Sequence, residues 1–303
     1  MGNLKVALDW TPNTNHTGFF VAKELGFYEE AGLEVQIISP AQDGYATTPA
    51  KKLELGECDF AIAPFESVIS LNTKAKKVNA VAIAALLQQD ISSIVTLTSS
   101  EITRPRDLDG RTYASYQARY EDAIVKQMII NDGGKGNLDF MYPAKLGIWD
   151  TLLKNVADST WIFDNWEGVE AETNGVALNH FRLADYDVPY AYSPVIAATA
   201  EAIAERKEPY KAFLQATKRG FQLAINDPKQ AVGILTSHLP ERDVKMINVG
   251  KSQEFVSPYY GDEAEWGSME KDRIDRFLLW LIEHELADES VLDHTFYTNV
   301  LLL

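Results

Sequence analysis

The chain has 303 residues, enough for one large or two medium domains, and its 46% hydrophobic and 24% charged residues match an ordinary globular protein. Its formal net charge of −16, from 44 acidic and 28 basic residues, argues against nucleic acid and anionic membranes as partners, because both attract basic surfaces. The only cysteine, Cys58, permits no internal disulfide, and we expect it to be a small buried hydrophobic residue.

The start of the sequence leaves two alternatives for the location of the protein. No apolar run approaches the roughly 18 residues of a membrane span. The first predicted strand, residues 4–8, begins too early to leave room for a signal peptide. We therefore expect either a cytoplasmic protein or a mature form whose leader is missing.

Strands and helices alternate along the first third of the chain. The predicted strands are residues 4–8, 34–38, 60–63, 78–87 and 94–97. The predicted helices are residues 17–31, 48–55 and 67–74, and Gly32 stands where a helix end favours positive φ. This βαβαβ order predicts a mostly parallel sheet with helices on both faces.

A second α/β unit is predicted to begin near residue 91. Its expected strands are residues 111–114, 140–142, 159–162 and 181–182, and its expected helices are 120–131, 149–156 and 167–174. An apolar strand at 193–200 then returns the chain to the first unit. The remainder is helical, with helices predicted at 209–226, 228–237, 244–252 and 271–285 from the 3.6-residue spacing of their apolar residues.

This order predicts an α/β protein with two lobes, the second inserted into the first. Lobe 1 is expected to comprise residues 1–92 and 196–303, and lobe 2 residues 93–195. The connecting strands are expected near residues 91–96 and 192–196. Such a pair of lobes is the arrangement of a hinge-bending solute-binding protein, with the ligand in the cleft between them.

The loop after the first strand is the most informative segment for function. It runs from Asp9 to His16 and leads into a helix, and ligands of open α/β sheets lie beyond the carboxyl ends of the strands. Trp10 either stacks on a flat ring or packs internally, and Asp9 can accept a hydrogen bond from an amino group on that ring. Asn13 either faces the ligand or caps the helix. His16 and Asp9 suggest a catalytic dyad, but we interpret His16 as a hydrogen-bonding or structural residue and include it among the candidate ligand-binding residues.

Two other strand ends carry candidate ligand residues. Phe65 and Glu66 follow the third strand, where Glu66 either faces the ligand or interacts with the helix dipole. Ser115 and Tyr116 open a strand-to-helix segment, residues 115–121, whose backbone N–H groups are placed to hold an anion. That segment contains no glycine, which makes it a poor phosphate site.

The sequence Trp161-Ile-Phe-Asp-Asn-Trp-Glu-Gly168 is the second candidate motif. A strand is expected to end near Phe163, which leaves Trp166 and Glu167 at the cleft. Either Trp166 stacks on a ring and Glu167 accepts from its amino group, or Trp166 packs and Glu167 caps the next helix. Tyr190, just before the return strand, either lines the cleft or packs at the hinge.

Common catalytic and metal-binding motifs do not occur in the sequence. The five histidines are far apart, and none has the H-x₃-H or H-E-x-x-H spacing of a metal site. There is no Gly-x-Ser-x-Gly motif, no phosphate-binding Walker loop and no dinucleotide fingerprint. We therefore expect no catalytic residue, no metal and no cofactor.

Residues 8–18, Leu-Asp-Trp-Thr-Pro-Asn-Thr-Asn-His-Thr-Gly, resemble a family that joins fungal thiamine-pyrimidine synthase to bacterial ABC-transporter solute-binding proteins for thiamine pyrimidine precursors. The resemblance continues through residues 22–35 and 55–60 and at Trp166-Glu-Gly168. Residues 258–260 and 266–267 resemble the C-terminal signature of the family. The resemblance covers most of the chain and implies the periplasmic-binding-protein type II fold.

The same resemblance implies roles for particular residues. Asp9 and Trp10 would hold the aminopyrimidine ring, and Glu167 would bind its amino group. The synthase holds pyridoxal phosphate with a lysine and consumes a histidine, and the matching positions here are Ala63 and Ser67. Its Cys-rich iron-binding motif is missing, and its glycine-containing phosphate loop corresponds to a glycine-free segment. These departures favour capture of a ligand over its synthesis.

The sequence therefore predicts a non-enzymatic solute-binding protein. It would capture a formylaminopyrimidine-type or hydroxymethylpyrimidine-type thiamine precursor, with the ring between Trp10 and an aromatic residue of the second lobe, and deliver it to an ABC permease. We expect a monomer in the periplasm or an extracellular lipoprotein, with a cytoplasmic location as the alternative. Alternative functions are a thiamine-pyrimidine biosynthetic enzyme and a binder of another solute, such as a sulfonate or nitrate. An anion binder needs a cation in its cleft, and Arg119 is the candidate.

Overall fold

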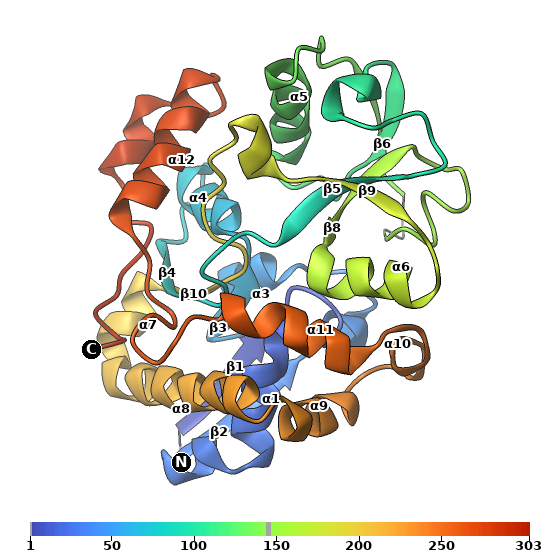
Figure 1. Ribbon diagram of the computed structural model, residues 1–303. Helices are drawn as coiled ribbons and strands as arrows, with labels where there is room; N and C mark the ends of the chain where they lie inside the picture. The colour runs from blue at the N-terminus through green and yellow to red at the C-terminus, as the bar shows by residue number, and fades with distance from the viewer. Residues whose placement is uncertain (1, 144–146) are drawn as a thin grey trace.

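The computed structural model describes residues 2–143 and 147–303, which form two five-stranded sheets surrounded by helices (Figure 1). The strand order is β2-β1-β3-β10-β4 in the first sheet and β7-β6-β8-β5-β9 in the second. The first sheet comprises β1 (Gly2–Ala7), β2 (Leu33–Ile38), β3 (Phe60–Ala63), β4 (Ala80–Ala85) and β10 (Val195–Thr199). The second comprises β5 (Ser92–Leu97), β6 (Arg111–Ala114), β7 (Leu138–Met141), β8 (Ser159–Phe163) and β9 (Leu178–Phe181).

Both sheets are mostly parallel, as predicted, and each contains one antiparallel strand. In the first sheet β1 is parallel to β2 and β3, whereas β10 is antiparallel to β3 and β4. In the second, β6 is parallel to β7 and β8, whereas β5 is antiparallel to β8 and β9. The antiparallel strands are therefore the two that the chain enters when it passes from one sheet to the other. The lobe limits at residues 92 and 195 remain a prediction.

Helices cover both faces of the first sheet, because successive side chains along its strands point alternately into two hydrophobic clusters. Val6 and Ile196 lie in the cluster that includes Phe213 and Phe221, whereas the adjacent residues Ala7 and Ala197 lie in the other cluster. The longer helices are α1 (Thr17–Glu24), α3 (Pro49–Leu55), α4 (Phe65–Thr73), α5 (Glu121–Asn131), α8 (Lys207–Asn226), α9 (Pro228–Thr236), α11 (Val249–Val256) and α12 (Lys271–Glu283). The shorter ones are α2 (Phe27–Glu30), α6 (Val169–Thr173), α7 (Ala200–Glu205) and α10 (Glu241–Met246).

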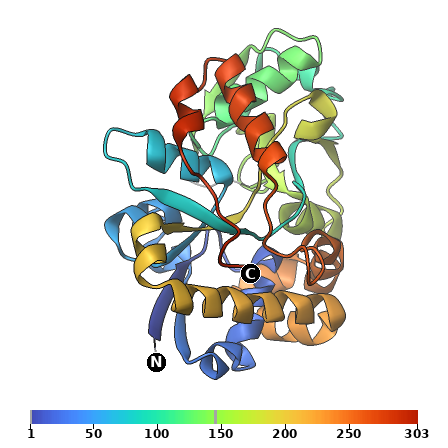
Figure 2. The same cartoon turned by 90° about the vertical axis from the view of Figure 1, so that its left-hand side faces the viewer.

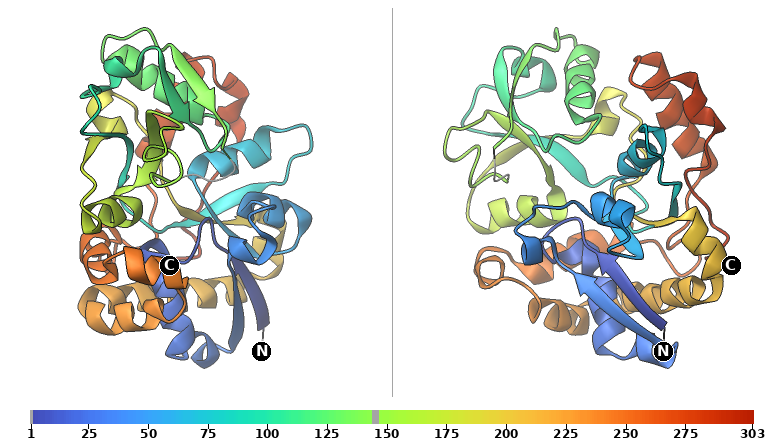
Figure 3. Two further views of the ribbon diagram at one scale, coloured as in Figure 1. Left: turned by 90° about the vertical axis from the view of Figure 1, so that its right-hand side faces the viewer. Right: turned by 180° about the vertical axis from the view of Figure 1, so that it is seen from behind.

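The two α/β units are stacked, as Figure 3 shows from two further sides. Helices α10 and α11 lie between the first unit and α6 of the second (Figure 1). The C-terminal helix α12 extends beside the second unit (Figure 2), where Phe277 contacts Tyr190 with ring centroids 5.5 Å apart. Within the described residues, none of the helices is both long and apolar enough to cross a membrane.

Several predicted helices differ from those in the structure. The predicted helix 17–31 is broken between α1 and α2 by Gly26, whose φ of 76° does not fit a right-handed helix. Gly32 has the predicted positive φ, 73°. The predicted helix 244–252 is divided into α10 and α11, because Ile247 is extended and Asn248 caps α11 through a 3.0 Å bond from the Lys251 amide.

Two predictions in the second unit were also inaccurate. Residues 149–156 form hydrogen-bonded turns instead of a helix, with Asn155 at a φ of 53°. The predicted helix 167–174 begins earlier, with a π-helical turn, η4 (Asp164–Gly168), that continues into α6. This turn matters for function because π-helical turns commonly occur at functional sites, where they change the direction of side chains.

Helices α1 and α8 cross without a side chain between them at Gly18 and Gly220. A Cβ added at Gly220 would lie 2.0 Å from the Gly18 carbonyl oxygen. Since neither backbone can move away without disturbing a filled core, we expect Gly220→Ala to reduce the free energy of unfolding by about 1–3 kcal/mol. Denaturant unfolding measures this change.

Gly233→Ala in α9 is the matched control. A Cβ at Gly233 meets no atom within 4 Å, so this variant should be neutral or more stable by about 0.4–1 kcal/mol. Equal stability of the two variants would contradict the close helix crossing.

Candidate functional site

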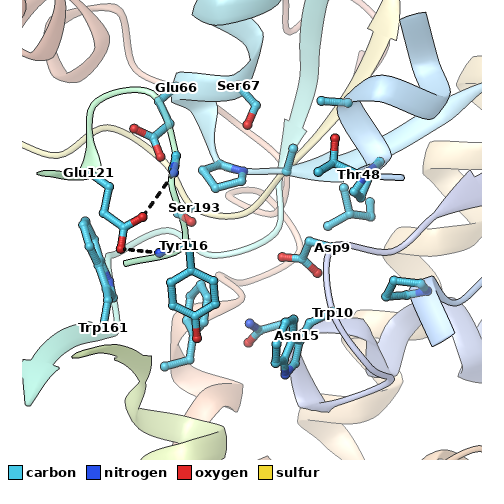
Figure 4. Close-up of a pocket in the computed structure, with 18 of the residues that line it drawn as sticks. Asp9, Trp10, Asn15, Thr48, Glu66, Ser67, Tyr116, Glu121, Trp161 and Ser193 are labelled. Atoms are coloured by element: carbon cyan, nitrogen blue, oxygen red, sulfur yellow. Dashed lines mark hydrogen bonds between the residues drawn. The ribbon is translucent and has the colours of Figure 1, made fainter. Parts of the chain in front are cut away.

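A cavity of about 410 Å³ lies where loops of the two sheets meet. It is lined by residues that follow β1 and β3, by the end of β8, and by the loops before α3, α5 and β10. Figure 4 shows Asp9, Trp10 and Asn15 on one side of this cavity and Glu66, Glu121 and Trp161 on the other. The predicted candidates that line it are Asp9, Trp10, Asn13, Glu66, Tyr116, Trp166, Glu167 and Tyr190.

Asp9 is held in place by His16, which does not itself line the cavity. The Asn13 amide donates to Nδ1 of His16 at 3.3 Å, so Nε2 carries the hydrogen and donates to Oδ1 of Asp9 at 2.7 Å. His16 is fully buried, whereas the Asp9 side chain is 16% exposed. The prediction of His16 as a ligand residue is therefore corrected: His16 positions Asp9 and has no surface at the cavity.

The loop that carries Asp9 is fixed by its own hydrogen bonds and by the second unit. The Asn13 side chain accepts from the Asn15 amide at 2.8 Å and caps the short helix η1 (Thr14–His16). From the π-helical turn, Nδ2 of Asn165 donates to Thr14 Oγ1 at 2.8 Å and to Asn15 Oδ1 at 2.9 Å. Because Asn165 is fully buried, these bonds join the two halves of the site with little solvent competition.

Trp10 belongs to an aromatic group at the cavity. Its ring lies 5.5 Å from that of Tyr45 and 6.1 Å from that of Tyr116, the second contact being edge-to-face. Tyr45 was not predicted, because it follows a short helix, η2 (Pro40–Asp43), that has no clear signal in the sequence. Because the rings of Tyr45 and Tyr116 are tilted relative to that of Trp10, they leave a face of the indole on which a flat ligand ring can stack.

The π-helical turn places Glu167 in the cavity wall. Oε2 of Glu167 accepts from the Phe163 amide at 3.2 Å. Burial raises the pKa of Glu167 to about 7, although this backbone bond opposes the rise. Trp166 is 3% exposed and packs with Val169 and Ile247, so most of its ring belongs to a hydrophobic cluster.

A second pair of carboxyl groups, Glu66 and Glu121, lies opposite Asp9 (Figure 4). Burial and the nearby Glu121 raise the pKa of Glu66 to about 8. Glu121 accepts from the Tyr113 hydroxyl at 2.8 Å and from the Tyr116 and Ala118 amides at 3.0 and 3.2 Å. Two of the amides that were considered for anion binding, those of Tyr116 and Ala118, are thus already bound by a carboxylate, which disfavours an anion in this segment.

Besides His16, two predicted ligand residues lie away from the cavity. Phe65 is buried in the hydrophobic core, because the first turn of α4 directs it away from Glu66. Ser115 is buried and donates to Asp122 at 2.6 Å. Arg119, the candidate cation, bonds to Thr73 and lies 5.0 Å over the Tyr120 ring. The described residues that line the cavity include no Lys, Arg or His.

Comparison with known proteins places the chain in a family. The family model described as NMT1/THI5 like matches residues 13–231. The chain belongs to this family. A formylaminopyrimidine-binding protein of Halalkalibacterium halodurans is 22% identical over 301 residues, covering 98% of this chain and 90% of the relative. A 4-amino-5-hydroxymethyl-2-methylpyrimidine phosphate synthase of Legionella pneumophila is 25% identical over 237 residues, covering 77% and 73%.

Solved structures confirm the predicted fold class. The ligand-binding component of an ABC-type import system from Staphylococcus aureus aligns with a TM-score of 0.71 at 17% identity, covering 99% of this chain and 98% of that one. Other aligned structures are likewise of the periplasmic-binding-protein fold. The two-lobed fold expected from the alternation of strands and helices is therefore correct.

Proposed function

We propose that this protein is a solute-binding protein that captures a thiamine pyrimidine precursor of the formylaminopyrimidine or hydroxymethylpyrimidine type. The observation that carries the proposal is the chemistry of the cavity wall. Four carboxyl-bearing residues, Asp9, Glu66, Glu121 and Glu167, line it together with aromatic rings, and its described lining contains no cationic side chain. Such a wall complements a flat ring that carries amino groups and disfavours a sulfonate or nitrate.

Each group of residues has a distinct role in this proposal. The ring stacks on Trp10, and Asp9 and Glu167 accept hydrogen bonds from its amino groups. His16 holds Asp9 from behind with a 2.7 Å bond, so the carboxylate is oriented before the ligand arrives. This preorganisation reduces the ordering cost of binding. The relatedness to a formylaminopyrimidine-binding protein over 98% of the chain supports the same ligand class.

Delivery to an ABC permease follows from the same proposal. The ABC import component of similar fold supports a transport role. We infer a monomer that acts in the periplasm or as an extracellular lipoprotein. Closure of two lobes around the ligand would present a distinct surface to the permease, and the ligand favours that state only as far as it binds it more tightly.

The alternative function is pyrimidine synthesis, since a related protein is a synthase. The residues at the cavity support capture instead. Ala63 and Ser67, the positions matched to the lysine and histidine of the synthase, both line the cavity. Neither side chain can form a Schiff base with pyridoxal phosphate. A pyrimidine product formed during incubation with pyridoxal phosphate and iron would reverse this conclusion.

A thermal-shift screen tests the proposed function. The melting temperature should rise with a formylaminopyrimidine or hydroxymethylpyrimidine compound, because a ligand that binds only the folded state stabilises it by mass action. Ethanesulfonate and nitrate should leave it unchanged. A rise with either anion, and none with the pyrimidines, would assign the protein to another solute class.

A further inference from the structure

The side of the cavity opposite Asp9 contains a buried carboxyl group whose hydrogen bonding is incomplete. Glu66 is 4% exposed, lies in the first turn of α4 and lines the cavity. Its Oε2 is buried and has no hydrogen-bond partner among the described residues. Since a buried polar atom without a partner costs about 1–3 kcal/mol, an unpaired oxygen at a ligand cavity points to a partner that arrives with the ligand.

Glu121 lies beside Glu66 (Figure 4) and determines which of the two carboxyl groups is charged. Three donors, the Tyr113 hydroxyl and two backbone amides, bind the carboxylate of Glu121. Such donors stabilise a negative charge, whereas two neighbouring carboxylates in a dry site cannot both remain ionised. The proton therefore belongs on Glu66, the member of the pair with fewer donors.

Two other groups face Glu66. The Tyr190 hydroxyl, before β10, and the Tyr120 backbone amide, before α5, both lower the pKa of Glu66, but burial and the nearby Glu121 raise it by more. Salt bridges of the described residues do not involve Glu66 or Glu121. The pKa of Glu66, about 8, agrees with the same direction.

We propose that Glu66 is an uncharged carboxylic acid that recognises the substituent of the pyrimidine by donating one hydrogen bond to it and accepting another from it. Such a group pairs with a ligand moiety that presents an acceptor oxygen and an N–H donor on the same side, as a formamide does in its cis rotamer. This inference rests on the proposed function. It makes a formamido substituent the preferred one and a hydroxymethyl substituent the weaker one, because a hydroxyl donates and accepts at a single atom and so fits the two separate carboxyl oxygens of Glu66 less well.

Two variants of Glu66 separate this role from that of a charged residue. Glu66→Gln keeps one donor and one acceptor, so it should bind the formylaminopyrimidine within about threefold of wild type. Glu66→Leu removes both and should weaken this ligand at least tenfold, but the hydroxymethylpyrimidine less than threefold. Calorimetric titration of wild type and both variants with both ligands gives the six affinities, and the melting temperatures of the free variants show whether both are folded.

Infrared spectroscopy of the free protein tests the protonation directly. The difference spectrum of wild type minus Glu66→Gln at pH 7 should contain the band of a protonated carboxyl group. A carboxylate band in its place, or a Gln variant as weak as the Leu variant, would overturn the proposal. Failure of wild type to bind any pyrimidine would instead refute the proposed function, and the infrared result would still decide whether Glu66 is protonated.

Discussion

Replacing Asp9 by Asn is expected to weaken pyrimidine binding by roughly 30- to 150-fold, which corresponds to a loss of about 2–3 kcal/mol. His16 would still donate to the side-chain oxygen at position 9, as it does to Asp9 at 2.7 Å. The Nδ2 group of the asparagine would then face the ligand, and its N–H donors would point at the amino N–H donors of the pyrimidine. The variant therefore loses one charge-assisted hydrogen bond and gains a repulsive contact.

Asp275→Asn is the control for the Asp9 variant. Asp275 lies on α12, pairs with Lys271 and does not line the cavity, so the same change of charge there should leave binding unchanged. Both variants should retain the far-ultraviolet circular dichroism of wild type. Equal affinity of wild type and Asp9→Asn would show that Asp9 makes no bond to the ligand.

The second large effect is expected for Trp10→Ala, which should weaken binding at least tenfold, or by about 1.4 kcal/mol. The variant loses the stacking surface, worth roughly 0.5–1.5 kcal/mol beyond burial, together with the buried area of the ring. It also removes the contacts that hold Tyr45 and Tyr116 at 5.5 and 6.1 Å. Calorimetry with the formylaminopyrimidine compound measures the loss.

Trp10→Phe distinguishes stacking from simple filling of space. A phenyl ring keeps an aromatic face at the same position, so this variant should recover most of the affinity that Trp10→Ala loses. A Phe variant as weak as the Ala variant would show that the indole is needed for its size or its N–H group. Unchanged affinity of Trp10→Ala would show that the ligand does not stack on this residue.

The fold could be predicted because its signals are local in sequence. Most strands could be predicted from short apolar runs, and the helices between them from the 3.6-residue spacing of apolar residues and from glycines at helix ends. The ends of the strands indicated where a ligand site would lie. The internal breaks at Gly26 and at Asn248 were missed, because the apolar period continues across both. At Gly26 a positive φ interrupts the helix despite that period, whereas the extended Ile247 ends α10 and the side chain of Asn248 caps the start of α11.

The candidate site could be predicted only in part, because its two sides meet through tertiary structure. Asp9, Trp10 and Glu167 were predicted to lie at the cavity from their positions after strands, and they line it. Trp161 and Tyr45 were not predicted to lie at the cavity. Trp161 lies within a strand and Tyr45 in an irregular loop, and the sequence did not indicate the direction of either side chain. The role of Glu121 could have been predicted from the sequence. A glutamate in the first turn of a helix commonly accepts hydrogen bonds from the free backbone amides that precede the helix.

Isothermal titration calorimetry of the purified protein shows whether the acidic, aromatic cavity binds an amino-bearing pyrimidine. Saturable one-to-one binding of a formylaminopyrimidine or hydroxymethylpyrimidine compound is expected, with no heat of binding for ethanesulfonate at the same concentrations. Saturable binding of the sulfonate without binding of either pyrimidine would contradict this expectation.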